Sequence, residues 1–171
     1  MSGILRFIDR ISDWTGYAVS LLIYVMLGCL VYEVTCRYVF NAPTSWAHEF
    51  TAFCFGIYFM CSAAYALRTK RMIHVDIIYA QLPRRGQALV NVGAFFFFFI
   101  VCYTLIWYGG LDAYGSWNAG ERSIASVWAP VLYPIKSAIP IGTSLLLLQG
   151  LADFVRELNV ALTGRELEEA K

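Results

Sequence analysis

The stretch GQALVNVGAFFFFFIVCYTLIWYGGL, residues 86–111, contains no charged side chain. The hydrocarbon core of a bilayer is about 30 Å thick, and an α-helix crosses it with roughly 20 mainly apolar residues. This stretch is long enough to do so. Three further windows, residues 14–32, 50–67 and 137–152, also lack charge. The last window is short, but Lys136 at its edge can extend its ammonium group toward the membrane surface.

The composition of the chain agrees with a membrane protein. Of its 171 residues 59% are hydrophobic and 15% are charged, and the mean hydropathy is +0.59. Soluble domains carry about 25% charged residues, and so few charges would not cover a soluble surface of this size. We therefore predict an all-α integral membrane protein formed by one domain, residues 1–171. Its four transmembrane helices are expected at roughly residues 14–40, 46–68, 86–111 and 134–156.

The distribution of basic residues predicts the orientation. With four spans both termini lie on one side, and that side would carry ten of the thirteen lysines and arginines. Cytoplasmic segments of membrane proteins are enriched in these residues. We therefore expect both the N-terminus and the C-terminus inside the cell. Only Arg37, Arg122 and Lys136 would lie on the outer side.

Three segments between or before the spans are expected to lie at the membrane surface. Residues 3–13 are amphipathic, and so are residues 70–84 in the cytoplasmic loop, whereas residues 115–133 are rich in aromatic side chains. Amphipathic helices and aromatic residues favour the interface. The residues expected to hold the cytoplasmic loop at the headgroups are Arg68, Lys70, Arg71, His74, Asp76, Arg84 and Arg85.

The connection between the first two spans gathers polar residues. Glu33 precedes Arg37 by four residues, the favourable order for an ion pair within one helix. Ser45 is expected to cap the second helix, and Glu49 in its first turn suits the helix dipole. A turn at residues 41–43 would bring Trp46 and Glu49 level with Arg37, so that Glu33, Arg37, His48 and Glu49 form a polar cluster at the outer membrane boundary. This cluster could either fasten the hairpin or bind a partner.

The sequence predicts no enzyme, cofactor or metal site. It contains no phosphate-binding glycine loop, HExxH or GxSxG motif. None of the five cysteines forms a CxxC pair, and each is expected to serve as a small apolar packing residue. Asn91 and Gln149 are the best polar candidates inside the spans, and we expect each to bond to a neighbouring helix. No nucleic-acid partner is expected.

Three motifs together resemble a known family. They are RYVFNAPTSWAHEF (residues 37–50), RMIHVDIIYAQLP (71–83) and GERSIASVWAPVLYPIKSAIPIGTSLLLLQG (120–150). Their order and spacing resemble the small, DctQ-like membrane subunit of TRAP transporters (tripartite ATP-independent periplasmic transporters) over about residues 7–155. The chain differs from the family at His48, where the family more often has an acidic residue.

The resemblance implies a role in a bacterial inner membrane. The partners would be a large membrane subunit, which carries the substrate and sodium sites, and a periplasmic protein that binds small organic anions. The small subunit would scaffold the large one and help to dock the periplasmic protein. The outer residues expected to contact these partners are Glu33, Arg37, Trp46, His48, Glu49, Glu121, Arg122, Ser123 and Trp128. Membrane lipids would cover the remaining surface.

A different class of protein is the alternative. A small four-span proton-coupled transporter acting as a homodimer, similar to the small multidrug-resistance family, also places a glutamate in its first span. The long loops of this chain and its strong charge bias argue against such an antiparallel dimer. Purification of the chain with or without a larger partner would separate the two hypotheses.

Overall fold

A computed structural model describes residues 2–69 and 84–163 of the chain. Within them it contains four helices, and each is long and apolar enough to cross a membrane. The four predicted transmembrane helices are thus confirmed. The helices are α1 (Ser2–Tyr38), α2 (Ala47–Arg68), α4 (Arg84–Ala119) and α5 (Tyr133–Thr163).

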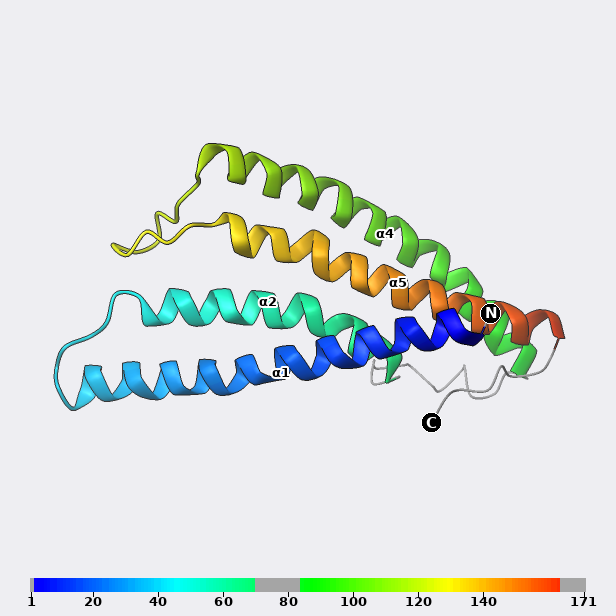
Figure 1. Cartoon of the computed structure of the whole chain (residues 1–171), viewed down its shortest axis with the longest axis horizontal. Helices are drawn as coiled ribbons and strands as arrows, with labels where there is room; N and C mark the ends of the chain where they lie inside the picture. The colour runs from blue at the N-terminus through cyan, green and yellow to red at the C-terminus, as the bar shows by residue number, and fades with distance from the viewer. Residues whose placement is uncertain (1, 70–83, 164–171) are drawn as a thin grey trace.

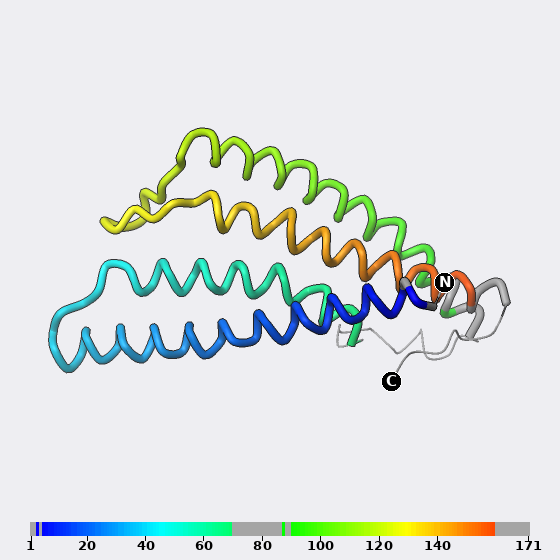
Figure 2. The backbone as a smooth tube through the Cα atoms, viewed as in Figure 1, coloured from blue at the N-terminus to red at the C-terminus, as the bar shows by residue number. Residues whose placement is uncertain are grey.

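The helices form an open array and not a closed bundle. Along the array the order is α1, α2, α5 and α4, as Figure 1 shows. Helix α2 packs against α1 and α5, whereas α4 packs against α5 and makes no comparable contact with α1 or α2. The backbone in Figure 2 traces two hairpins, α1 with α2 and α4 with α5, whose turns lie at the same end of the molecule. We call this end the loop end, and the opposite end, where α1 begins, the terminal end.

Helix α1 is longer than predicted. The segment 3–13, expected as a separate interfacial helix, is the first part of the continuous helix α1. No proline occurs before Pro43, so nothing in the sequence of residues 2–38 forces a break. The placement of residues 3–13 on the membrane surface remains a prediction. The expected surface segment 70–84 lies outside the described residues except for Arg84, the first residue of α4.

Helix α4 also continues beyond its predicted end, as far as Ala119. Gly120 stops it with a positive φ of 59°, a conformation that favours glycine. The amide of Glu121 then donates to the carbonyl of Ser116 at 3.1 Å, which closes the helix with the bond of a Schellman motif. Only residues 120–132 of the predicted surface segment 115–133 form a loop, and this loop connects α4 to α5.

The predicted N-cap of the second helix is wrong. Trp46 occupies the cap position with a helical backbone, and no side chain caps the helix there. A contact of Thr44 explains why Ser45 does not cap the helix. The amide and the hydroxyl of Thr44 both donate to the Glu33 carboxylate. The chain is therefore tied back to α1 one residue before Ser45. Asn41, at a φ of 51°, makes the turn between the helices.

Small residues allow the helices to approach closely. A Cβ on Gly142 of α5 would lie 2.7 Å from the backbone of Met60 in α2. Gly16 of α1 faces Tyr65, and Gly150 of α5 faces Phe98 in the same way. Close packing at small residues is the usual basis of helix association in membranes. Even so, only 6% of the apolar window is buried in α1 and in α4, so these outer helices offer broad apolar faces.

Candidate functional site

The predicted ion pair between Glu33 and Arg37 is confirmed at the loop end. The Nη2 atom of Arg37 lies 2.5 Å from Oε1 of Glu33, and its Nε atom donates to the same oxygen at 3.1 Å. Oε2 of Glu33 accepts from Thr44, so both carboxylate oxygens are engaged. Glu33 is only 7% exposed. This carboxylate therefore fastens the turn between α1 and α2.

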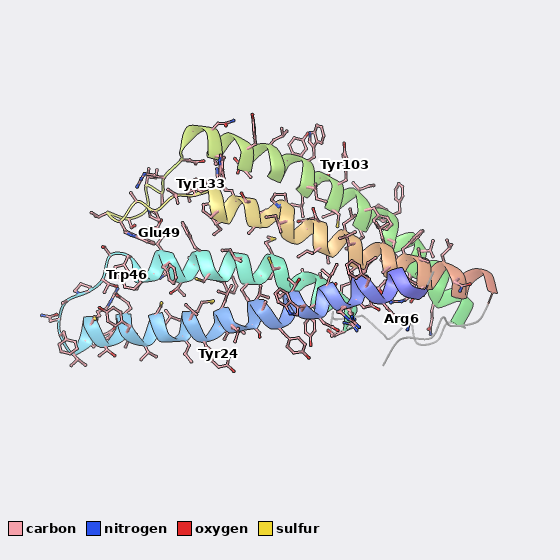
Figure 3. The ribbon with its side chains drawn as sticks, in the orientation of Figure 1. Arg6, Tyr24, Trp46, Glu49, Tyr103 and Tyr133 are labelled. Carbon is pink, nitrogen blue, oxygen red and sulfur yellow. The ribbon has the colours of Figure 1, made fainter. Side chains whose placement is uncertain are left out.

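Glu49 and His48 do not join the pair of Glu33 and Arg37, contrary to the predicted cluster of four residues. Glu49 instead accepts a hydrogen bond from the hydroxyl of Ser126 in the loop 120–132. Figure 3 shows Glu49 pointing from α2 toward that loop. His48 is exposed on the neighbouring face of the helix. The loop end thus holds two separate polar contacts, one within the first hairpin and one between the hairpins.

Trp46, just before α2, adds aromatic contacts both to α1 and to the loop 120–132. Its ring centroid lies 6.0 Å from that of Tyr32 in α1 and 6.5 Å from that of Trp128 in the loop. The second contact is edge-on, a favourable arrangement of aromatic rings. We call the loop 120–132, bound to α2 by Trp46–Trp128 and Glu49–Ser126, the strap. It joins the two hairpins where their turns lie.

Hydrogen bonds within the strap fix its shape. The amide of Ser123 donates to the carbonyl of Pro130 at 2.8 Å, and the amide of Leu132 donates to the carbonyl of Glu121 at 2.9 Å. Arg122 donates from its side chain to the carbonyl of Ala129 at 3.3 Å. Ser123 is buried, and its hydroxyl accepts from the amide of Ala125. These predicted rim residues therefore stabilise the strap itself.

The strap is also anchored by a charged contact at its first residues. The carboxylate of Glu121 accepts from the ammonium of Lys136 at 2.7 Å and from the hydroxyl of Ser116. Lys136 also bonds to Asp112 at 3.2 Å. The hydrogen bond from Lys136, followed by that from Ser116, lowers the pKa of Glu121 below its ordinary value. The sequence indicated Glu121 but not its two partners, because Ser116 comes from α4 and Lys136 from α5.

Arg68, predicted to anchor the cytoplasmic loop at the headgroups, contacts α1 at the terminal end. Its Nη1 atom donates to the backbone carbonyl of Asp9 at 2.7 Å, and its guanidinium pairs with the carboxylate of Asp13. The end of α2 is thereby attached to α1. The other residues predicted as anchors cannot be compared in this way. Lys70, Arg71, His74 and Asp76 lie outside the described residues, as do the side chains of Arg84 and Arg85.

Gln149 confirms the prediction that it bonds to a neighbouring helix. It is fully buried in α5, and its Oε1 atom accepts from the hydroxyl of Ser12 in α1 at 2.7 Å. The residues that sequence reasoning missed are its neighbours Asp9 and Arg156, whose side chains form an ion pair at 2.5 Å. They are 147 positions apart, so no local spacing could have related them.

The contacts described so far hold helices and a loop together. Within residues 2–69 and 84–163, no group of three or more histidine, cysteine, aspartate or glutamate side chains could hold a metal ion. The five cysteines are free thiols in or near the helices. Each buried side-chain nitrogen and oxygen in this part of the chain has a hydrogen-bond partner. The arrangement is that of a multi-span membrane component in which polar groups serve the architecture.

The comparison with protein families identifies this component. The family model described as "Tripartite ATP-independent periplasmic transporters, DctQ component" matches residues 26–160, well over half of the chain. The chain belongs to this family, as its motifs suggested. It is therefore one component of a three-part transporter and a multi-pass protein of the inner membrane. A search of curated proteins gave no match.

Proposed function

We propose that the chain is the small permease subunit of a sodium-coupled TRAP transporter for small organic anions. In this role it scaffolds the large elevator-type membrane subunit and helps to dock the periplasmic substrate-binding protein. The family supplies the general role. The observation that supports the scaffold role is the open array of helices. In this array α4 packs strongly against α5 and against no other helix of the described residues.

The open array argues against a transport path inside this chain. A substrate path needs polar groups that converge on an enclosed route across the membrane. Here several charged side chains of the described spans pair with each other near the two ends, as Glu33 does with Arg37 and Asp9 with Arg156. The four helices do not surround a common centre. These features support a scaffold whose partner carries the substrate.

The two outer helices offer surfaces on which a large subunit could pack. Tyr24 of α1 and Tyr103 of α4 point away from the array on opposite sides (Figure 3). Both are more than half exposed, like Phe97 and Tyr108 on α4. A face this rich in large aromatic side chains suits contact with another protein as well as with lipid. We propose that the large subunit covers one of these faces and that lipid covers the rest.

We propose the strap as a docking surface for the periplasmic protein, with the loop end on the outer side of the membrane. Ile124 and Val127 are 102% and 96% exposed, although the strap that carries them is held by internal hydrogen bonds. Apolar side chains displayed on a fixed loop are typical of a protein contact. The other rim residues, such as Glu49 and Ser123, would position this surface. Arg122 and His48 are exposed beside it.

Copurification tests the proposal. The tagged chain is extracted in mild detergent from cells that express it together with its neighbouring genes. A stoichiometric multi-span partner, followed by sodium-dependent uptake that requires both chains, is the expected result. Recovery of the chain alone as a homodimer that exchanges protons would contradict the proposal and favour a small autonomous transporter. Protease added from the outer side, cleaving only at the loop end, would establish the proposed orientation.

A further inference from the structure

We propose that Asp9, Ser12, Arg68, Gln149 and Arg156 form an interhelical clamp that holds the start of α1 upright against α2 and α5. The clamp would keep the two hairpins joined at the terminal end. This inference concerns the folded chain itself and does not depend on the role in transport. It also differs from the expectation that residues 3–13 lie flat on the membrane surface.

Asp9 is the centre of the clamp. Its Oδ2 atom lies 2.5 Å from Nη2 of Arg156, and its Oδ1 atom accepts from Nε2 of Gln149 at 3.2 Å. Its backbone carbonyl accepts from Arg68. One residue of α1 thus contacts both α2 and α5 while remaining only 6% exposed. A buried carboxylate is costly unless it is paired and hydrogen-bonded, so these contacts must form together.

Gln149 of α5 bonds to two residues of α1 and so fixes how the two helices face each other. Its side chain is 0% exposed, and it accepts from Ser12 with its oxygen while donating to Asp9 with its nitrogen. The nitrogen also lies 3.4 Å from Oδ1 of Asp153, which in turn pairs with Arg156 at 2.8 Å. A buried amide with both ends engaged accepts little rotation or sliding of its helix. The contacts therefore fix α1 relative to α5 in both rotation and height.

The clamp lies where the start of α1 meets α5, and it therefore connects the first helix with the last. Over its whole length α1 packs mainly on α2, and its contact with α5 is much smaller. Figure 1 shows the start of α1 beside the second half of α5. The family match begins at residue 26, so Asp9 and Ser12 precede it while their partners lie within it. The clamp thus attaches the segment before the match to the last helix of the family domain.

A double-mutant cycle in the purified chain tests the pairing. Asp9→Asn and Arg156→Gln are each expected to lower the unfolding temperature in detergent by at least about 5 °C, because each removes the closest charged partner of the other side chain in a largely buried site. The variant with both changes should lose no more than the weaker single variant, since the pair is already broken. Arg10→Gln is the matched control, because Arg10 is exposed on the same helix. Losses no larger than the control, or fully additive losses, would overturn the clamp.

Cysteine cross-linking in membranes tests the upright placement directly. In a chain whose five native cysteines are alanine, Ser12→Cys with Gln149→Cys should be joined by a short bifunctional maleimide, because the native side chains touch at 2.7 Å and the reagent spans the gap that the shorter cysteine leaves in place of glutamine. Arg10→Cys with Gln149→Cys, on the outer face of α1, should not. Adding Asp9→Asn should slow the first reaction several-fold. Absence of the 12–149 cross-link in membranes would overturn the proposal, whatever the stability measurements show.

Discussion

Gly142 of α5 lies against the backbone of Met60 in α2, so closely that a Cβ at this position would be 2.7 Å from the Met60 carbonyl group. This is the closest approach to main-chain atoms among the glycines of the described residues. Because backbone atoms cannot rotate away as a side chain can, the distance between the two hairpins depends on the missing Cβ.

We predict that Gly142→Ala separates the hairpins and destabilises the chain. Overpacking of this kind costs about 1–3 kcal/mol. The measurement is the unfolding temperature in detergent, together with the fraction of chain that remains monodisperse. Gly110→Ala is the control, because a Cβ at Gly110 meets no atom within 4 Å. It should be neutral or stabilising by up to about 1 kcal/mol, since alanine favours helix. Equal effects at the two positions would refute the close contact.

The Glu33 carboxylate should hold the turn between α1 and α2 closed. Glu33→Gln removes the charge that pairs with Arg37 and weakens the acceptor for Thr44. We expect chymotrypsin to cleave several-fold faster after Tyr38, the last residue of α1, and after Phe40 in the turn, since both are exposed. Thr35→Val is the control, because this hydroxyl bonds only to the carbonyl of Val31 in its own helix. A cleavage rate unchanged by Glu33→Gln would show that the turn is held by other contacts.

The contact of Glu121 with Lys136 predicts how the strap responds to acid. The pKa of Glu121 in the folded chain lies below the ordinary value of 4.5, so the contact contributes stability above that pH and loses it as the pH falls through the folded value. The strap should therefore stay unchanged from pH 8 to about pH 5 and loosen only in stronger acid.

Trp117 reports this change, because its ring lies 4.4 Å from that of Tyr133 where α4 meets α5. In a variant in which the other four tryptophans are phenylalanine, so that an aromatic pair remains at positions 46 and 128, the emission of Trp117 should shift only in acid below about pH 4.5. With Glu121→Gln the acid-like emission should already be present at pH 7. A midpoint near neutral pH would point to another group.

The exposed tip of the strap should matter for transport and not for folding. Ile124→Ser and Val127→Ser remove apolar groups that touch little in this chain. If each is buried by the periplasmic protein, it contributes about 1.5 kcal/mol, and uptake at limiting binding protein should fall about tenfold. The unfolding temperature should not change. Asn118→Ser, an exposed change at the end of α4, is the control. Full uptake by both tip variants would exclude the strap as the docking surface.

Several features followed from the sequence alone because they depend on local composition. The uncharged windows predicted four spanning helices, since only the solvent and the length of a segment enter that argument. The spacing of Glu33 and Arg37 predicted their pair, because residues four apart share a helix face. Gln149 was expected to bond across helices, since a buried amide in an apolar span needs a partner. The quoted motifs predicted the family.

Other features appeared only in the tertiary structure. The order of the helices, the contact of Glu49 with Ser126 and the pair of Asp9 with Arg156 join residues far apart in the sequence. In a soluble helix an apolar stripe marks the buried face, but lipid is as apolar as a protein core, so the spans carry no such mark. Which face of each helix packs, and at what height, is decided by glycine contacts and buried polar bonds. Those exist only once the helices have met.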